Sequence, residues 1–146
     1  MKIFFRLFFF LAVLSSAAWM VSCEPDDTID NDPTDIRNEY VGVWRFTESG
    51  YLKNGQLQSY IVTISLDTDN SSQVLLENFG NPGLSQSNTI SGIVTTNQIV
   101  VSSQTLTNGW IVEGSGKRSS AGKMDWNYSI TAGGDEEYYT ATAVKQ

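Results

Sequence analysis

Two stretches of the chain alternate between apolar and polar side chains at every residue. Their apolar positions are Tyr60, Val62, Ile64 and Leu66, and Met124, Trp126, Tyr128 and Ile130. A two-residue period with one apolar face is the pattern of a half-buried antiparallel β-strand. No window of the sequence sustains the helical period of about 3.6 residues, so we expect the folded part to be all-β.

Turn-forming residues separate these apolar stretches. Asn54-Gly55 and Asn108-Gly109 suit tight hairpin turns that need a positive φ. Asn81-Pro82-Gly83 and Gly133-Gly134-Asp135 also interrupt strands. The combined pattern predicts strands near residues 40–48, 57–67, 72–79, 88–95, 98–103, 109–117, 123–132 and 136–144. Strands that follow one another through short links favour an antiparallel up-and-down meander.

Such a meander can close into a barrel or divide into two packed sheets. The region of residues 40–146 is short for two generous sheets, and closure also removes exposed strand edges. We therefore predict one domain over residues 40–146, a small barrel of about eight strands. A small β-sandwich is the alternative.

The first predicted strand carries a motif of a known family. Gly42-Val43-Trp44 resembles the Gly-x-Trp motif of the lipocalins, in which the tryptophan closes one end of an eight-stranded barrel. The chain departs from that family in lacking its Thr-Asp-Tyr-like segment and its C-terminal helix. The arginine that the family carries near the last strand is also absent, and only Lys145 is found there.

Small lipocalin-like lipoproteins of Bacteroidota are more similar to this chain. They share an acidic leader, a Tyr-x-Gly-x-Trp-like first strand, an Asn-Phe segment and a Gly-x-Gly-rich later strand. The corresponding segments are Tyr40-Val41-Gly42-Val43-Trp44, Asn78-Phe79 and Gly114-Ser115-Gly116. The resemblance covers nearly all of the chain after Cys23, and it implies a fold and a cellular address but no defined activity.

The N-terminus has the pattern of a secretory signal. Lys2 and Arg6 supply positive charge, and Leu7 to Ala18 is apolar apart from two serines. This stretch is shorter than the roughly 20 residues that a membrane span needs, although adding Trp19 to Val21 would extend it. We expect residues 1–22 to be a signal peptide.

Cys23 is the expected anchor. Met20-Val21-Ser22-Cys23 resembles a bacterial lipobox, whose cysteine receives diacylglycerol and becomes the first residue. Cleavage after Ser16-Ala17-Ala18 is the alternative, and it would leave Cys23 as a lone free thiol in a secreted protein. We therefore expect lipid attachment at Cys23 and a location on the outer membrane, facing the periplasm or the cell surface.

An acidic segment follows the cysteine. Glu24 to Glu39 holds seven acidic residues, one arginine and two prolines, with few large apolar side chains. Such a composition buries too little surface to offset the entropy of ordering, so residues 23–39 are predicted to be a lipidated, disordered tether. The acids directly after the cysteine resemble the surface-export signal of Bacteroidota lipoproteins, and solubilising charge is the alternative.

Composition excludes several kinds of chemistry. The chain has no histidine and one cysteine, so histidine-based zinc sites, Ser/His/Asp triads and Cys/His dyads cannot form. The net charge of −7 offers no basic surface for phosphates, so nucleic-acid binding is not expected.

Carboxylates are the remaining route to acid–base catalysis. The acids of the strand region outside obvious turns are Glu48, Glu77, Glu113 and Asp125. Each is assigned to the polar face of its strand or to its end, so we predict that they are solvated and that the protein is not an enzyme. Asp67-Thr68-Asp69-Asn70 lacks the glycine and distal glutamate of a calcium loop, which predicts a polar turn and no metal site.

Aromatic residues are the last notable feature. Those on apolar faces by alternation are Trp44, Phe46, Tyr60, Trp110, Trp126 and Tyr128. They are candidates for stacking on a ligand or for packing the core. The interior of an eight-stranded barrel is just wide enough for one of these uses, and so many rings favour the packed core. Tyr138 and Tyr139, beside Glu136 and Glu137, are assigned to a rim or an edge strand, and an exposed surface spot is the alternative.

Two functions stay open. The first is a non-catalytic outer-membrane lipoprotein whose lipocalin-like barrel binds a small apolar ligand through the aromatic candidates Trp44, Tyr60, Trp110, Trp126 and Tyr128. The second is a structural or protein-interaction subunit of an envelope complex, with a filled barrel and an exposed apolar patch. No cofactor is expected in either case.

Overall fold

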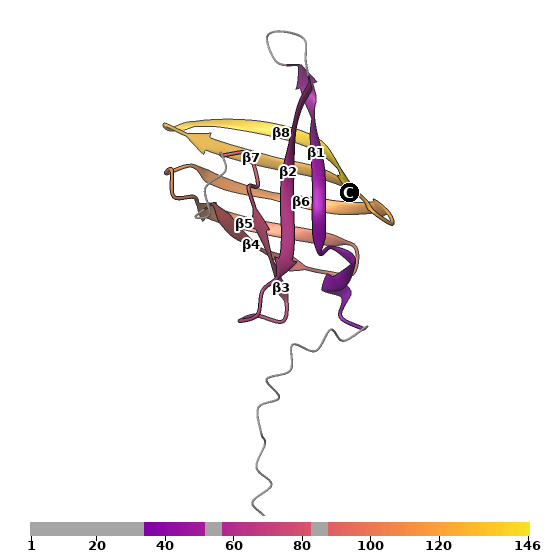
Figure 1. Cartoon of the computed structure of the whole chain (residues 1–146). Helices are drawn as coiled ribbons and strands as arrows, with labels where there is room; N and C mark the ends of the chain where they lie inside the picture. The colour runs from indigo at the N-terminus through magenta and orange to yellow at the C-terminus, as the bar shows by residue number, and fades with distance from the viewer. Residues whose placement is uncertain (1–33, 52–56, 83–87) are drawn as a thin grey trace, which may run out of the picture. The chain divides into compact units, whose positions relative to one another are not determined.

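The computed structural model describes residues 34–51, 57–82 and 88–146. The predicted signal peptide, Cys23, most of the acidic segment and the Asn54-Gly55 turn lie outside the described residues. The strands form one closed antiparallel barrel in which each is hydrogen-bonded to its neighbours in chain order. Figure 1 shows how the labelled strands are arranged. The predicted barrel is therefore confirmed, and the β-sandwich alternative is wrong.

The barrel begins with a short 3-10 helix, η1 (Ile36–Glu39). The strands are β1 (Gly42–Tyr51), β2 (Leu57–Leu66), β3 (Gln73–Glu77), β4 (Thr89–Val94), β5 (Gln98–Thr105), β6 (Ile111–Ser120), β7 (Lys123–Ala132) and β8 (Asp135–Lys145). Pairing of β1 with β8 closes the barrel. Each predicted strand has an observed counterpart whose ends differ by a few residues. β3 stops before Asn78 because that residue adopts a left-handed backbone, with φ of 64°.

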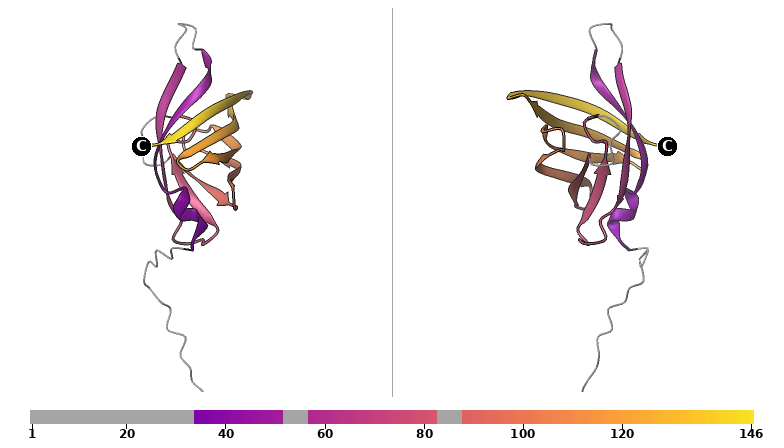
Figure 2. Two further views of the ribbon diagram at one scale, coloured as in Figure 1. Left: turned by 90° about the vertical axis from the view of Figure 1, so that its right-hand side faces the viewer. Right: turned by 60° about the vertical axis from the view of Figure 1, so that its left-hand side comes forward.

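The connections lie alternately at two ends of the barrel. The closed end carries η1 and the turns at residues 67–72, 95–97 and 121–122, and the mouth carries the described connecting residues 78–82, 106–110 and 133–134. Figure 2 shows η1, in indigo, at the same end as the turn between β2 and β3. Within the described ranges, no helix has the length and apolar character needed to cross a bilayer.

Aromatic rings dominate the core between the two ends. The ring of Phe46 lies 5.6 Å from that of Tyr60 and 5.5 Å from that of Trp126, measured between centroids. Phe79 lies 5.0 Å from Trp126 and 5.1 Å from Tyr128. All five side chains are buried, so the middle of the barrel is packed with rings.

Strand β6 presents bare backbone to β7 at two positions. Gly116 pairs with Trp126 and Gly114 with Tyr128 across the β6–β7 ladder. A Cβ atom on Gly116 would lie 2.1 Å from Cε2 of Trp126, and one on Gly114 would lie 2.5 Å from Cβ of Tyr128. Gly116 is therefore required by the indole ring opposite it, and Gly114 by the close approach of the β7 backbone at Asn127 and Tyr128.

The first-strand motif closes one end of the barrel. Trp44 is fully buried and donates its indole N–H to the carbonyl oxygen of Tyr40 across 2.7 Å. The ammonium of Lys145 lies 5.6 Å from the centre of the Trp44 ring, within the range of a cation–π contact. Gly42 has φ of 138°, and a Cβ there would lie 2.7 Å from Cε of Lys145. Lys145 thus covers the ring of Trp44 at the closed end of the barrel.

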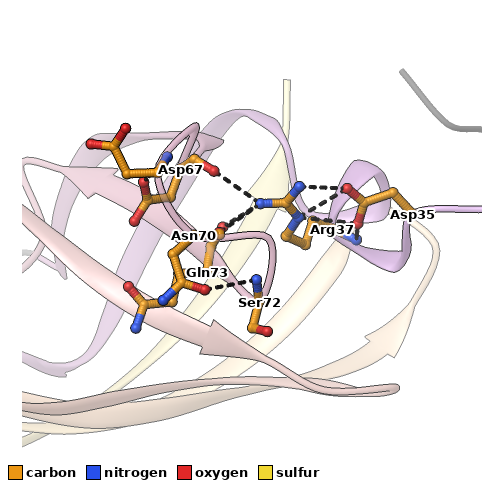
Figure 3. A network of polar contacts seen from close by, with 7 residues as sticks. Asp35, Arg37, Asp67, Asn70, Ser72 and Gln73 are labelled. Carbon is orange, nitrogen blue, oxygen red and sulfur yellow. Dashed lines mark hydrogen bonds and ion pairs between the residues drawn. The ribbon is translucent and has the colours of Figure 1, made fainter. Parts of the chain in front are cut away.

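Arg37 joins η1 to the turn between β2 and β3. Its Nη1 donates to the carbonyl oxygens of Asp67, Asn70 and Gln73 at 3.0, 2.9 and 3.0 Å, as the dashed lines of Figure 3 show. Its Nη2 pairs with the carboxylate of Asp35 at 2.7 Å. Asp35 also caps η1 by accepting the backbone N–H of Arg37.

These contacts correct the predicted extent of the disordered tether. The prediction ran through Glu39, but the chain is ordered in η1 from Ile36, and Arg37 is only 9% exposed. The composition rule failed because the guanidinium of Arg37 binds three backbone carbonyls of a turn that is distant in the sequence. The carboxylate of Glu39 adds an ion pair with Arg118 of β6.

The segment Asp67-Thr68-Asp69-Asn70 forms a polar turn, as predicted. The carboxylate of Asp67 accepts the N–H of Asp69 at 2.9 Å, and the amide oxygen of Asn70 accepts the N–H of Ser72 at 3.0 Å. Among the residues the structure describes, no group of three or more potential ligands could hold a metal ion.

Candidate binding site

A cavity of about 360 Å³ lies at the mouth of the barrel. Its lining comes from β1, β2, β7, β8 and the connections that precede β4 and β6. The lining side chains that carry polar groups or large rings include Glu48, Gln58, Trp110, Asp135, Glu137 and Tyr139. Ile130 and Ala132 of β7 supply apolar surface to the same cavity. The cavity thus sits above the ring-filled core, at the end opposite η1.

Glu48 reaches this cavity because of its position in β1. Trp44, Phe46 and Glu48 occupy alternate positions of the strand, and alternate side chains of a strand share one face. The side chain of Glu48 therefore points inward, and the residue is only 8% exposed. The prediction that Glu48 lies on a solvated outer face is wrong, since its strand parity places it with the core residues.

The other acids proposed as solvated are exposed. Glu77, Glu113 and Asp125 each lie on the outer surface of the barrel. They pair across the ladders with Thr63, Ser129 and Lys117 on neighbouring strands, and none of them lines the mouth cavity.

A chain of hydrogen bonds runs from the core to Glu48. The hydroxyl of Tyr128 donates to Oε1 of Glu48 at 2.5 Å, and the hydroxyls of Tyr60 and Tyr128 are 2.9 Å apart. Burial raises the pKa of both tyrosines above the ordinary value, so both stay neutral and keep a proton to donate. The two phenols therefore hold one edge of the carboxylate in a fixed orientation.

Tyr139 and Glu137 form the rim of the cavity on β8. The hydroxyl of Tyr139 donates a hydrogen bond to the Glu137 carboxylate, which raises the pKa of Tyr139 to about 12. The Tyr139 ring stacks on that of Tyr128, with centroids 5.3 Å apart and an interplanar angle of 14°. Tyr139 is thus a half-buried lid over Tyr128, while its neighbour Tyr138 is 79% exposed.

Trp110 contributes to the lining from the connection that precedes β6. It precedes β6 in a turn in which Gly109 has φ of 82°, as the Asn108-Gly109 pair predicts. The carbonyl oxygen of Trp110 accepts the N–H of Leu106 at 2.7 Å, and its N–H donates to the Asn108 side chain at 3.0 Å. Trp110 is only partly buried and packs against the core. The prediction that it lies on the apolar face of a strand is wrong, because β6 begins one residue later.

The predicted aromatic candidates therefore lie in four different places. Trp110 lines the cavity, and Tyr60 and Tyr128 support Glu48 from below. Trp126 lies within the ring cluster of the core, and Trp44 lies at the closed end. Sequence reasoning missed Glu48, Asp135, Glu137 and Tyr139 as lining residues, although the parity of β1 could have identified Glu48.

Carboxylates and rings give the cavity its chemical character. Glu48, Asp135 and Glu137 contribute carboxylates, and Trp110 and Tyr139 contribute aromatic faces. The lining contains no lysine or arginine among the described residues. Such a surface can hold a small molecule by stacking, by hydrogen bonds to carboxylate oxygens and by electrostatic attraction.

Comparisons with known proteins identify no family. No protein-family model and no curated protein sequence matches the chain. The chain is similar to the structure of EF1p2_mFAP2b bound to DFHBI, at 13% identity and a TM-score of 0.49, over 77% of this chain and 98% of that one. It is also similar to a redesigned β-barrel, b11L5F_LGL, at 16% identity and a TM-score of 0.46, over 77% of this chain and 96% of that one.

Proposed function

We propose that this chain is a non-catalytic, lipid-anchored lipoprotein of the outer membrane whose barrel binds a small ligand at its mouth. The single observation that carries the binding function is the cavity of about 360 Å³ above the packed core. Small-molecule sites in proteins are typically concave volumes of roughly 300–1,000 Å³ with apolar walls and a few polar groups. The cavity is at the small end of that range, so the ligand is small.

The packed core limits how deep the ligand can lie. Phe46, Phe79 and Trp126 fill the middle of the barrel. A ligand therefore contacts the rim and Glu48 and does not enter the barrel to its full depth. This differs from an open barrel that encloses a long apolar chain.

The lipid anchor is supported by the sequence. Met20-Val21-Ser22-Cys23 has the form of a lipobox and follows a signal-like apolar stretch. A lipid on Cys23 would hold the barrel at the membrane without a spanning segment.

A protein-interaction function has one observation in its favour. Tyr138 is 79% exposed and lines a shallow surface groove with Ser103 and Glu113 on the outside of the barrel. Exposed aromatic residues are common anchors of protein interfaces. This surface is separate from the mouth, so the two functions can be tested independently.

Native mass spectrometry of the protein purified from its own host tests the proposal. A mass that exceeds residues 23–146 by a diacylglyceryl group and an acyl chain is the expected result for the anchor. A further adduct that is lost on denaturation is the expected result for a ligand. An unacylated chain would overturn the anchor, and a folded protein without adduct that binds no small molecule in a fragment screen would overturn the binding function.

A further inference from the structure

We propose that the mouth cavity selects a small organic cation, an ammonium group carried on an apolar or aromatic body. This inference rests on the proposed ligand-binding function and names the chemical class of the ligand. It is carried by Glu48, a carboxylate nine-tenths buried that lines the cavity without a cationic partner among the described residues.

Glu48 has no cationic partner among the side chains that the structure describes. Its Oε1 accepts a hydrogen bond from Tyr128, a neutral phenol, and the ion pairs of the described residues are formed by Arg37 and Arg118 with other carboxylates. A buried carboxylate without a counter-charge is costly, and buried charges in proteins are normally paired. A cation that enters the cavity supplies the missing partner.

Charge is segregated along the barrel. The described lysines and arginines all lie at the closed end or in the half of their strand nearest to it: Arg37, Arg45, Lys117, Arg118, Lys123 and Lys145. The described charged residues in the half of each strand nearest to the mouth are all acidic: Glu48, Glu77, Glu113, Asp135, Glu136 and Glu137. Lys53 lies outside the described residues. The described mouth therefore attracts cations and repels anions.

The basic residues of the closed end are also engaged there. Arg37 pairs with Asp35, Arg118 with Glu39, and Lys145 lies over the Trp44 ring. None of these three side chains is free to neutralise the mouth. The segregation is thus maintained by contacts within the fold.

Aromatic faces complete a site for an organic cation. Trp110 and Tyr139 line the same cavity as Glu48. The face of an aromatic ring attracts an ammonium group, and its apolar surface accommodates the body of the ligand. A metal ion does not fit as well, because the described residues form no group of three potential ligands.

Ligand-observed NMR titration of the full-length protein, purified from its host, tests this inference with three probes of matched size. The probes are benzylammonium, benzyl alcohol and benzoate. Benzylammonium is expected to bind about tenfold or more tightly than benzyl alcohol, with benzoate weakest, because a buried ion pair contributes that order of selectivity. Its affinity should also fall as salt is added.

Variants then assign the selectivity to Glu48. Glu48→Gln keeps the shape and can still accept the Tyr128 hydrogen bond, so it should fold and should lose about tenfold in affinity for benzylammonium while binding benzyl alcohol unchanged. Glu77→Gln removes an acid outside the cavity and is the matched control, with no expected change. Glu137→Gln removes a second carboxylate of the cavity, at the rim, without changing a buried residue. Its affinity for benzylammonium is expected to fall about threefold.

The outcomes separate this inference from the proposed function. Equal binding of benzylammonium and benzyl alcohol, with no effect of either cavity variant, overturns the cation selectivity while the binding function stands. Tighter binding of benzoate than of benzylammonium also overturns the cation selectivity and leaves the binding function standing. Failure of all three probes to bind a folded protein that also carries no adduct overturns both.

Discussion

The hydroxyl of Tyr128 donates a hydrogen bond of 2.5 Å to the carboxylate of Glu48, which joins the aromatic core to the acidic cavity. The same tyrosine contacts the hydroxyl of Tyr60 below and the ring of Tyr139 beside it. A substitution at Tyr128 therefore changes contacts in the core, at the rim and with the carboxylate of Glu48.

Tyr128→Phe tests the contribution of this contact to stability. The variant keeps the ring but leaves a buried carboxylate with one donor fewer, so we expect the free energy of unfolding to fall by about 1–3 kcal/mol. Urea unfolding followed by tryptophan fluorescence measures it. Tyr138→Phe removes an exposed hydroxyl and is the control, expected to change stability little. Equal effects of the two variants would contradict the assigned role of Tyr128.

Arg37→Lys tests the closed end. Lysine keeps the charge but lacks the planar fork that bonds Asp35 and three turn carbonyls together. We expect a loss of about 1.5–3 kcal/mol in the free energy of unfolding, together with faster amide exchange in residues 67–73. Arg45→Lys, at an exposed position, is the matched control. Unchanged amide exchange in residues 67–73 would contradict the role of Arg37 in holding this turn.

Alkaline pH should destabilise the barrel. Burial raises the pKa of Tyr60 and Tyr128 above the ordinary 10.0, and the hydrogen bond to Glu137 raises that of Tyr139 to about 12. Folding thus favours the neutral phenols, so their contribution is fully present below about pH 10 and is lost as the pH rises through the folded values. Thermal melts from pH 8 to 12, with tyrosinate absorbance, measure it. The Tyr139→Phe variant should lose less stability between about pH 10 and pH 12 than the unmodified protein. An unaltered dependence of the melting temperature on pH would contradict the hydrogen bond between Tyr139 and Glu137.

Gly116→Ala tests the close approach of Trp126. A methyl group at this position would overlap the indole ring, so we expect a loss of about 1–3 kcal/mol. Trp126→Phe in the same chain should recover part of that loss, because the smaller ring relieves the overlap. Ser115→Ala, at the neighbouring position on the other face, is the control. Independent, additive effects of the two substitutions would show that Gly116 and Trp126 do not interact.

The strands follow from local pattern, because alternation over residues such as Tyr60 to Leu66 reports directly which face is buried. The burial of Trp44 follows from the same pattern in β1. These are short-range properties of the chain, and the sequence contains them in full.

The candidate site depends on information of another kind. From the sequence alone, Glu48 is assigned to a polar face or to a strand end, although its spacing from Trp44 and Phe46 places it on the inward face. The convergence of Glu48 with Trp110 and Glu137 requires barrel closure, which brings β1 beside β8. Arg37 likewise acts through carbonyls about thirty residues away, which a composition rule for the acidic segment cannot register.

The position of η1 gives the barrel a direction. η1 lies at the closed end, so the chain that leads back to Cys23 joins the barrel at the end opposite Glu48. The described N-terminal segment and the ligand entrance are therefore at opposite poles of the barrel, so a ligand can enter the mouth without displacing η1.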